Sequence, residues 1–535
     1  MSLTARPLGC YVAELLAANG IDTVFGIPGV HTLELYRGLA AVPRLRHVLT
    51  RHEQGAGFAA DGFARVSGRP AAAFVISGPG VTNILTSVAQ AFSDSVPMLI
   101  IASTPVRASL GRRWGVLHEL ADQQAMMSSV LDLAFTAARA EGVRDHLQSI
   151  FHEFRTGRPR PAYLGIPLDL LAESTTMVAE RFAAASVQPP PGREEFERAA
   201  ALLTAAQRPM IIAGGGAQGA ARELRTLVEN LDGYLVTTSA GKGVLPEAHR
   251  CNLGGSLPFA PTQQLIAQAD VVLAVGTEMA ETDIYTSSKL ALTGKLIRVD
   301  ISSQLNAQYP AEVTLRADAR AATAALAVLV RKRSGWCSQA GEAATHRAGI
   351  DAQLDAASLV RRRGLVAIRA ALPADAVVCS DMTQIAYLGN YAYVTDLPGA
   401  WLHPVGYGTL GYALPAALGA KLAMPGRAII SLAGDFGLQF TLPELATAVE
   451  LGLSLPVVVW NNAALGQIRD DMLAANIPPT GVVARNPDFI ALAEAYGATG
   501  QRVRSTAELT NAIRQALQRH GPTLIEVNEG EWSSN

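Results

Sequence analysis

The chain has 535 residues, of which 49% are hydrophobic, and its 44 basic and 46 acidic residues give a formal net charge of −2. This balance, without long charge runs, argues against a nucleic-acid-binding protein or a polybasic membrane-surface protein. The N-terminus shows no signal peptide, and no run reaches the ~20 apolar residues of a membrane-spanning helix. The four cysteines, at positions 10, 251, 337 and 379, show no metal-ligand spacing. We therefore expect a soluble, cytoplasmic protein with no nucleic-acid or membrane partner.

Short apolar runs alternate with Ala- and Leu-rich helical stretches from end to end, for example at 72–76, 97–101, 209–213, 270–275 and 376–379. Because these runs lack polar alternation, we expect strands that are buried on both faces in parallel sheets covered by helices. Two breaks, at 189–192 and 331–349, are read as linkers. The sequence therefore predicts an α/β protein with three doubly wound parallel-sheet domains, at 1–180, 190–332 and 355–535.

Two polar residues, Asp435 and Asn462, each follow a strand-like run, at 428–432 and 456–460. The carboxyl ends of parallel strands meet at one edge of a sheet, so a carboxylate and an amide oxygen there can hold a hard divalent cation that also binds phosphate oxygens. We therefore predict a Mg²⁺–diphosphate site whose ligands are Asp435, Asn462 and the main-chain carbonyl of Ala464. A helix over 441–451 would point its amino end at the anion. The alternative is a plain turn capped by an aspartate.

The segment from Ser431 to Gly466 resembles the diphosphate motif of thiamine-diphosphate enzymes, and it is similar to the acetolactate synthase and 2-oxo-acid decarboxylase group. The resemblance covers nearly the whole chain and includes VFGIPG at 24–29, RHEQGA at 51–56, SGPGVTN at 77–83 and GTLG at 408–411. It implies pyrimidine-binding, central and diphosphate-binding domains in this order, a homodimer or homotetramer with sites between subunits, and thiamine diphosphate and Mg²⁺ as cofactors. The cofactor-binding residues that it implies are Glu53, Gly408, Leu410, Gly434, Asp435, Phe436, Asn462, Ala464, Gly466 and Gln467.

The resemblance also assigns roles at the pyrimidine end of the cofactor. It pairs the carboxyl group of Glu53 with the ring nitrogen N1′, where the two can share a proton. It places Leu410 as an apolar wedge between the two rings and the carbonyl of Gly408 as the acceptor for the 4′-amino group. Read without the resemblance, Glu53 is a helix-start glutamate favoured by the helix dipole, and Leu410 belongs to a Gly-rich turn before a helix over 414–423.

The residues near the reacting carbon decide between reactions. Val30 stands where pyruvate-decarboxylase-like members carry a polar acid–base residue, and Ile468 stands where they carry a glutamate. His31 and His118 are the candidate proton donors, because an imidazole changes its charge near neutral pH. A surface loop position is the alternative for His118. The catalytic candidates are Glu53, His118, Leu410, His31 and Gln467, and the substrate candidates are Val30, Ser77, His118, Ile468, Asp470 and Asp471.

Asp470 and Asp471 make the region after Asn462 acidic. This suits a cationic substrate, because a carboxylate binds a guanidinium in a two-pronged pair; a solvated helix face is the alternative. The runs at 25–38 and 466–472 resemble the branch of 5-guanidino-2-oxopentanoate decarboxylases. We expect an enzyme that decarboxylates such a small-molecule 2-oxo acid to an aldehyde and CO₂. The alternatives are an acetolactate-synthase-type carboligase, which joins the decarboxylated unit to a second carbonyl compound, and a non-catalytic paralogue.

The central third contains a glycine-rich turn at 214–216 and an aspartate, Asp300, that could meet a ribose. Acetolactate synthases hold FAD in this domain. Here the stretch at 254–257 lacks their Met- and His-containing segment, and 276–283 is acidic. We therefore expect the central domain to be structural, without FAD.

Overall fold

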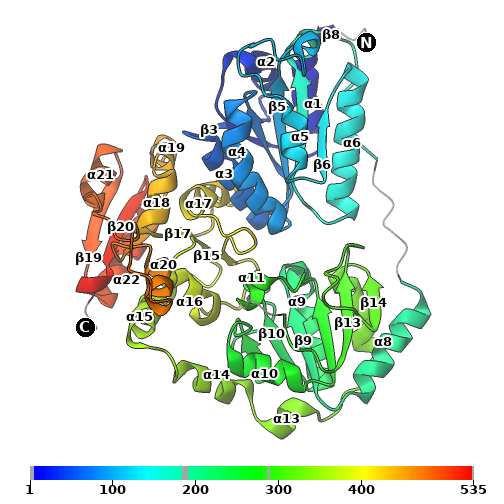
Figure 1. Cartoon of the computed structure of the whole chain (residues 1–535), viewed down its shortest axis with the longest axis vertical. Coiled ribbons are helices and arrows are strands. Elements are labelled where there is room, and N and C mark those ends of the chain that lie inside the picture. The colour runs from blue at the N-terminus through cyan, green and yellow to red at the C-terminus, as the bar shows by residue number, and fades with distance from the viewer. Residues whose placement is uncertain (1–4, 184–190, 286–288, 533–535) are drawn as a thin grey trace. The chain divides into compact units, whose positions relative to one another are not determined.

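The computed structural model describes residues 5–183, 191–285 and 289–532. Three six-stranded parallel sheets, each flanked by helices, follow one another along the chain, and a two-stranded antiparallel pair, β1 (Arg6–Pro7) with β8 (Ser174–Thr175), is added to the first (Figure 1). Six strands are buried at every residue: β4 (Ala71–Val75), β5 (Met98–Thr104), β7 (Ala162–Pro167), β9 (Pro209–Ala213), β12 (Val271–Val275) and β17 (Ile429–Gly434). The prediction of parallel sheets that are covered on both faces is confirmed.

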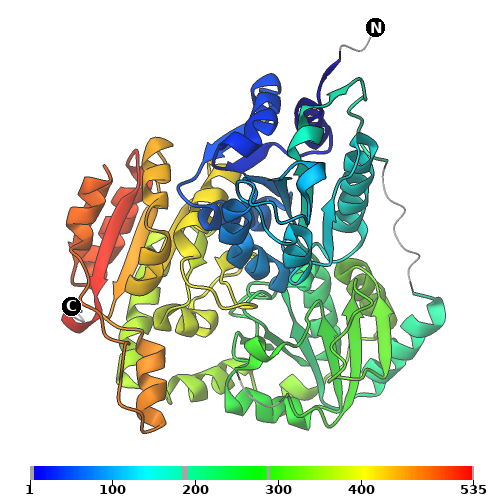
Figure 2. The same ribbon diagram turned by 45° about the horizontal axis from the view of Figure 1, so that its top comes forward.

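The first sheet has the strand order β3-β2-β4-β5-β7-β6. Helices α1 and α6 lie on one face of this sheet, and α3 and α4 lie on the other (Figures 1 and 2). The elements are β2 (Thr23–Gly26), β3 (Arg46–Leu49), β4 (Ala71–Val75), β5 (Met98–Thr104), β6 (Leu133–Thr136), β7 (Ala162–Pro167), α1 (Leu8–Ala18), α2 (Leu33–Ala41), α3 (Glu53–Ser67), α4 (Pro79–Ser93), α5 (Gln123–Ser128), α6 (Ala140–Thr156), α7 (Leu168–Ala172), η1 (Val30–Thr32) and η2 (Arg107–Ser109).

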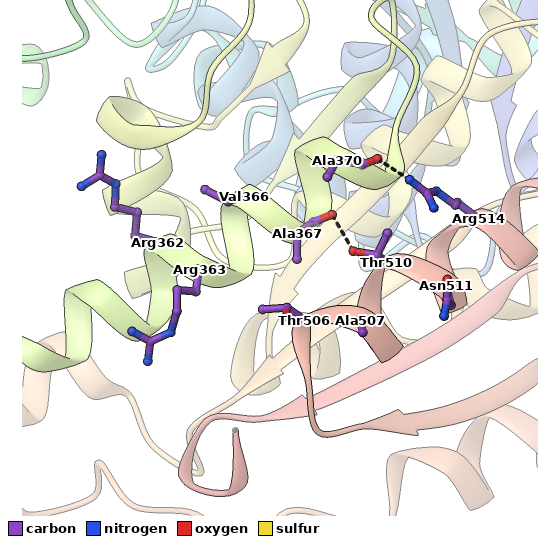
Figure 3. Close-up of a pocket in the computed structure, with 10 residues that line it drawn as sticks. All are labelled: Arg362, Arg363, Val366, Ala367, Ala370, Thr506, Ala507, Thr510, Asn511 and Arg514. Atoms are coloured by element: carbon purple, nitrogen blue, oxygen red, sulfur yellow. Dashed lines mark hydrogen bonds between the residues drawn. The ribbon is translucent and has the colours of Figure 1, made fainter. Parts of the chain in front are cut away.

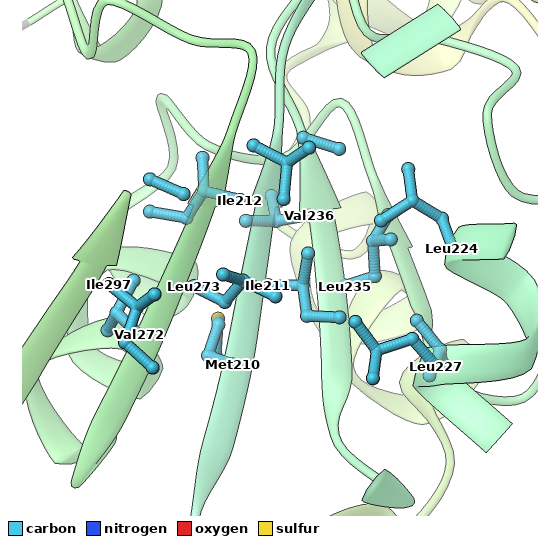
Figure 4. Packing of buried hydrophobic residues seen from close by; sticks show 14 of the residues in the cluster. Met210, Ile211, Ile212, Leu224, Leu227, Leu235, Val236, Val272, Leu273 and Ile297 are labelled. Carbon is cyan, nitrogen blue, oxygen red and sulfur yellow. The ribbon is translucent and has the colours of Figure 1, made fainter. Parts of the chain in front are cut away.

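The second sheet has the order β11-β10-β9-β12-β13-β14. Its aliphatic core joins side chains of β9, β10, β12 and β13 to Leu224 and Leu227 of α9 (Figure 4). The elements are β9 (Pro209–Ala213), β10 (Tyr234–Thr237), β11 (Asn252–Gly254), β12 (Val271–Val275), β13 (Lys295–Asp300), β14 (Val313–Arg316), α8 (Arg193–Ala205), η3 (Gly215–Ala220), α9 (Ala221–Leu231), α10 (Ala260–Gln268), α11 (Glu281–Ile284), α12 (Ala319–Leu329), α13 (Trp336–Ala340) and α14 (Ala343–Asp351).

The third sheet has the order β16-β15-β17-β18-β20-β19. Its elements are β15 (Val377–Ser380), β16 (Trp401–Leu402), β17 (Ile429–Gly434), β18 (Pro456–Asn461), β19 (Thr499–Val503), β20 (Thr523–Asn528), α15 (Ala356–Ala371), α16 (Gln384–Ala392), α17 (Ala413–Ala423), α18 (Asp435–Thr441), α19 (Glu444–Glu450), α20 (Gly466–Ala474), α21 (Phe489–Ala495), α22 (Thr506–Gln518) and η4 (Glu529–Glu531).

By internal contacts the chain forms two compact units. The first comprises the described residues within 1–187, 407–502 and 516–526, and the second comprises those within 188–406, 503–515 and 527–535. Every site residue predicted from the sequence falls in the first unit. The predicted site residues of one chain therefore belong to one compact unit.

The two predicted linkers have different outcomes. Half of the one at 189–192, residues 189 and 190, lies outside the described residues. The polar segment at 331–349 is not a linker, because it forms α13 and the start of α14. Trp336 and Cys337 of α13 are 5% and 1% exposed and belong to the core of the second sheet. Their burial outweighs the polar composition around them.

Candidate active site

Glu53 is the first residue of α3. Helix α3 is rich in small residues because it packs closely on its neighbours, and its first turn faces the first turn of α4. There the Asn83 side-chain amide donates a 3.0 Å hydrogen bond to the Glu53 carboxylate. The half-buried Glu53 is therefore held by a partner across two helix starts rather than left free at a helix end.

A second glutamate, Glu444 at the start of α19, anchors the approach to α3. Its carboxylate accepts the backbone N–H groups of Arg51 and His52 at 2.9 and 3.0 Å, and the Thr447 hydroxyl at 2.8 Å. Glu444 is 1% exposed, and burial raises the pKa of its carboxyl group, an effect that these hydrogen bonds oppose. The side chain fixes the turn that presents Glu53.

This contact corrects one prediction. The helix expected over 441–451 forms as α19, at Glu444–Glu450, but it does not follow the strand directly. The helix that follows the strand directly is α18, which starts at Asp435. The amino end of α19 instead carries Glu444 toward α3, because Pro443 takes the position before its first turn and allows the change of direction.

Two histidines and a serine meet at the end of β4. The His31 Nδ1 atom lies 2.7 Å from the Ser77 hydroxyl oxygen, and the His31 and His118 rings pack edge to face with centroids 5.1 Å apart. Burial, and then the nearby His118, lower the pKa of His31. Near neutral pH this favours the uncharged form of His31. The Nδ1 atom of His118 is buried and has no hydrogen-bond partner among the described residues.

The backbone explains why His118 points there. His118 has a φ of +62°, which a bulky residue rarely adopts, and its main chain lies against Gly78. A Cβ on Gly78 would come within 2.6 Å of the His118 carbonyl oxygen. Below them the Gln123 amide accepts the N–H of Gly78 at 3.0 Å and donates to the Tyr163 hydroxyl at 2.7 Å. The hydrogen bonds of the buried Gln123 side chain therefore hold the Gly78 backbone, against which His118 packs.

Hydrogen bonds on both sides of Leu410 fix the segment that precedes α17. Thr409 donates its N–H and its hydroxyl to the Gln90 side-chain oxygen at 3.2 and 3.0 Å. The Gly411 carbonyl accepts the Thr441 hydroxyl at 2.7 Å. Leu410, between these anchors, is half-buried. The expected helix over 414–423 is confirmed as α17.

Asp435 and Asn462 come together at the ends of β17 and β18. The Asp435 carboxylate is 2% exposed and accepts the backbone N–H groups of Asp435, Phe436 and Asn462. Burial raises the pKa of Asp435, an effect that these hydrogen bonds oppose. The Asn462 side chain accepts the Ala464 N–H at 3.1 Å across a turn in which Ala463 has a φ of +54°. A carboxylate, an amide oxygen and the carbonyls of this turn form a hard-oxygen donor set.

Asn486, which the sequence did not single out, supports this pair. Its side-chain amide donates to Asp435 at 2.6 Å and to the Asn461 side-chain oxygen at 3.0 Å. Gln439 donates to Asn486 at 3.2 Å and to the Asp435 carbonyl at 2.9 Å. The pattern around the Asn486-Pro487 dipeptide reads only as a turn, so no sequence signal marked the residue.

Helix α20 begins directly after this turn, at Gly466. Gln467 and Asp471 are exposed and hydrogen-bonded to each other at 3.0 Å, and Asp470 pairs with Arg469 at 3.0 Å. Ile468 is 48% exposed, and Val30, in the other half of the site, is 63% exposed. Within one chain these predicted substrate residues stand open to solvent.

The packing of helices α3 and α17 determines how far apart Glu53 and Leu410 lie within one chain. The two helices pack antiparallel, because a Cβ on Gly62 would collide with Ala416 and a Cβ on Gly419 would collide with Ala59. Glu53 begins α3 and Leu410 precedes α17, so the two residues lie at opposite ends of the pair. At 1.5 Å per residue the starts of the two helices are about 18 Å apart along this pair. Within one chain Glu53 and Leu410 are therefore held apart.

A groove of about 630 Å³ lies elsewhere, between α15 and α22 (Figure 3). Ala367 and Ala370 of α15 accept hydrogen bonds from Thr510 and Arg514 of α22 at 3.2 and 2.9 Å. None of the predicted site residues lines this groove. Its lining residues are Arg362, Arg363, Val366, Ala367, Ala370, Thr506, Ala507, Thr510, Asn511 and Arg514.

The glycine-rich turn of the central sheet is occupied by the chain itself. The N–H of Gly214 donates to Val275 at 2.9 Å, and the N–H of Gly216 donates to Gly276 at 3.0 Å. Asp300 accepts the N–H of Ser302 at 2.8 Å. Amide groups that would hold a dinucleotide phosphate already have partners within the domain, which favours a structural role.

We expect the purified protein to lack a flavin absorption band and to release FAD completely on gel filtration after incubation with an excess of it. The reason is that binding would require the hydrogen bonds at Gly214 and Gly216 to break. Flavin that co-elutes in stoichiometric amount would contradict this expectation.

Comparisons with known proteins bear on all three sheets. The N-terminal thiamine pyrophosphate-binding domain model matches residues 7–126, the central domain model matches 196–326, and the C-terminal thiamine pyrophosphate-binding domain model matches 381–527. The chain belongs to the thiamine pyrophosphate enzyme family. Thiamine pyrophosphate is thiamine diphosphate, so the cofactor implied by the sequence resemblance is supported by the two binding-domain models.

Relatives within the thiamine pyrophosphate enzyme family include both reaction types considered above. A probable 2-ketoarginine decarboxylase of Pseudomonas aeruginosa is 50% identical over 526 residues, which are 97% of this chain and 93% of that protein. The large subunit of acetolactate synthase isozyme 1 of Escherichia coli is 30% identical over 543 residues, with 97% and 93% covered. An acetolactate synthase of Mycobacterium bovis is 31% identical over 532 residues, with 94% and 85% covered. None of the helices in the described ranges combines the length and apolar composition needed to cross a bilayer.

Proposed function

We propose that this enzyme is a thiamine-diphosphate- and Mg²⁺-dependent decarboxylase of 5-guanidino-2-oxopentanoate, the compound also called 2-ketoarginine. The observation that carries the proposal is the 50% identity, over 97% of the chain, to a probable 2-ketoarginine decarboxylase. The acetolactate synthases compared above are more distant, at 30% and 31%. The carboligase reaction remains the second candidate because those relatives also cover nearly the whole chain.

The diphosphate end of the site fits Mg²⁺. The Asp435 carboxylate, the Asn462 side chain and the Ala464 carbonyl are the proposed ligands, with Gly434, Phe436, Gly466 and Gln467 beside the diphosphate. A buried carboxylate with a raised pKa gains most from a cation placed next to it, which supports this assignment. Bound thiamine diphosphate supplies the electron sink that allows the bond between the ketone carbon and the carboxylate to break.

Two chains are needed for a complete site in this proposal. Glu53 of one copy takes the pyrimidine nitrogen, while the Gly408 carbonyl and Leu410 of a second copy take the 4′-amino group and the space between the rings. The antiparallel packing of α3 and α17 supports this arrangement, because it separates Glu53 from Leu410 within a chain. The open positions of Val30 and Ile468 fit a partner that covers them.

Decarboxylation to an aldehyde consumes one proton at the carbon that loses CO₂. His118 is the proposed donor, because its Nδ1 atom is buried, lacks a partner among the residues the structure describes, and lies beside His31. His31 and Ser77 then orient and re-protonate it through the contact at 2.7 Å between them. Asp470 and Asp471 are proposed to bind the guanidinium group of the substrate.

The proposal is tested by measuring CO₂ release from 5-guanidino-2-oxopentanoate, 2-oxohexanoate and pyruvate, with identification of the products. We expect the highest kcat/KM for the guanidino acid and 4-guanidinobutanal as its product. Replacing both Asp470 and Asp471 by asparagine should raise KM for the guanidino acid roughly 10–100-fold, since one hydrogen bond to a charged group contributes about 1.5–3 kcal/mol and each asparagine keeps an acceptor oxygen. KM for 2-oxohexanoate should not change. A preference for pyruvate with acetolactate as product would overturn the proposal.

Asn83→Ala should lower kcat/KM roughly 10–100-fold, because it removes the hydrogen bond that orients the Glu53 carboxylate. The matched control is Thr82→Ala, an exposed hydroxyl one residue earlier on α4 that bonds only locally to the Pro79 carbonyl. Steady-state kinetics and circular dichroism on both variants separate orientation from folding. Equal activity in the two variants would remove Asn83 from the site.

A further inference from the structure

Two cysteines that are distant in the sequence become neighbours in the second compact unit. Cys251 directly precedes β11, and Cys337 lies in α13. Their sulfur atoms and a carboxylate oxygen of Asp232 all lie within 4.8 Å of one another. The two cysteines are 0% and 1% exposed, and neither forms a disulfide in the structure. A buried, adjacent thiol pair can do chemistry that a lone buried thiol cannot.

The position of Cys337 is fixed by the loop that ends α9. Asp232, with a φ of +50°, accepts the N–H groups of Gly335 and Ser338 at 2.7 and 3.1 Å. The Cys337 N–H donates to the Asp232 carbonyl at 2.8 Å, and its thiol points to the Arg250 carbonyl at 3.5 Å. These bonds hold α13 against the sheet and keep its sulfur within 4.8 Å of the Cys251 sulfur.

A metal ion fits this cluster poorly. The Arg250 guanidinium forms an ion pair with one Asp232 oxygen, and the second oxygen accepts two backbone N–H groups. A divalent cation would therefore meet a fixed positive charge and a carboxylate whose oxygens are already engaged. The same guanidinium favours a thiolate, which is the form that reacts with peroxides and disulfides.

We propose that Cys251 and Cys337 are a reversible thiol–disulfide pair that hydrogen peroxide oxidises and that, once oxidised, pins α13 to the central sheet. The Cys337 thiolate attacks one peroxide oxygen, the O–O bond breaks, and a sulfenic acid and water form. The Cys251 sulfur then attacks the Cys337 sulfur, the S–O bond breaks, and the second oxygen leaves as water. Two thiols and one peroxide thus give one disulfide and two waters.

The order of attack follows from the surroundings of each thiol. The hydrogen bond with Cys251, and then Arg250, lower the pKa of Cys337 against the opposing effect of burial. The same hydrogen bond and burial raise the pKa of Cys251. Cys337 is therefore the attacking sulfur and Cys251 the resolving one. A thiol reductant reverses the reaction by exchange.

The disulfide would close a loop that contains β11, β12, β13 and β14, which are four of the six strands of the central sheet. Cross-linking a long loop removes conformations from the unfolded chain. We expect oxidation to raise the midpoint of thermal unfolding by roughly 2–4 °C. The decarboxylation rate at low temperature should not change, because neither cysteine belongs to the proposed active site.

The test treats wild-type holoenzyme with hydrogen peroxide, blocks the remaining thiols under denaturing conditions and maps the peptides by mass spectrometry. We expect one peptide pair joining Cys251 to Cys337, two remaining free thiols, and full reversal by dithiothreitol. Cys10→Ser, which removes a buried thiol from α1, should keep the cross-link and the thermal shift. Cys251→Ser and Cys337→Ser should lose both.

Two results would overturn the proposal. One is the recovery of four free thiols, or of a cross-link that involves Cys10 or Cys379, after oxidation of the wild-type enzyme. The other is stoichiometric zinc in the metal content of the purified protein that is lost in Cys337→Ser. The first result is obtained on the wild-type chain alone and does not depend on whether a variant folds, and the second is read only from a Cys337→Ser protein whose circular dichroism matches the wild type.

Discussion

Glu53→Gln should reduce decarboxylation by about 10²–10⁴-fold while leaving the affinity for thiamine diphosphate nearly unchanged. The glutamine keeps the size of the side chain and its neighbour Asn83, but it cannot exchange a proton with the pyrimidine ring. The loss should therefore appear in kcat rather than in cofactor binding. Exchange of the cofactor C2 proton with deuterated water, followed by NMR after acid quenching, should slow by a similar factor.

The matched control is Glu141→Gln on α6, an exposed glutamate in the same domain. It should retain wild-type rates of exchange and of CO₂ release. If Glu53→Gln also exchanged the C2 proton at the wild-type rate, the role given to Glu53 would have to be abandoned, although the cofactor assignment would stand.

Asp435→Asn should weaken Mg²⁺-dependent cofactor binding more strongly than the roughly 10–100-fold that is typical when a residue supporting a metal ligand is replaced. The variant keeps the shape of the side chain but removes the charge that attracts the cation. Isothermal titration of thiamine diphosphate in the presence of Mg²⁺ measures the change directly. Asn486→Ala, which removes one of the hydrogen bonds to Asp435 but none of the proposed metal ligands, should fall within that 10–100-fold range.

Thermal unfolding separates lost binding from lost folding. The raised pKa of Asp435 means that, without metal, its charged form costs stability as the pH rises above the ordinary carboxyl value. Asp435→Asn removes that cost, so the apo variant should unfold at or above the wild-type midpoint. Mg²⁺ with cofactor should then raise the midpoint of the wild type but not of the variant. Asp145→Asn, at an exposed ion pair on α6, should behave as wild type.

The sequence predicted the layers of the fold because the apolar run that marks each buried strand is a local pattern. Runs without polar alternation, such as 209–213 and 270–275, form β9 and β12, and β12 begins one residue later than its run, after Asp270. The ends of β17 and β18 likewise bring Asp435 and Asn462 together, since consecutive parallel strands place their carboxyl ends side by side. Residues whose role follows from a strand end or a helix start were found from the sequence.

Residues whose role depends on long-range packing were not found. Asn486 and Glu444 reach the site from turns and helix starts that look ordinary in the sequence. The four cysteines looked scattered, yet α13 folds back and places Cys337 beside Cys251. The segment at 331–349 was interpreted as a linker because most of its residues are polar. In the structure, Trp336 and Cys337 of this segment pack on the core of the central sheet.

The separation of Glu53 from Leu410 also required the structure. The sequence shows glycines at 62 and 419 in two helical stretches, but it does not show which helix each of them packs on. In the structure they let α3 and α17 pack closely in opposite directions, which places Glu53 and Leu410, the two proposed cofactor-binding residues, at opposite ends. That geometry gives the proposed site its dependence on two chains.

Subunit complementation tests this central point most directly. Glu53→Gln and Asp435→Asn chains, each inactive alone, are co-expressed with different tags, and mixed oligomers are assayed for CO₂ release. If each site joins Glu53 of one chain to Asp435 of another, a mixed dimer contains one intact site, and random assembly should restore about one quarter of wild-type activity. If the mixture stays as inactive as its two parents, the cofactor is held within a single chain and the account is wrong.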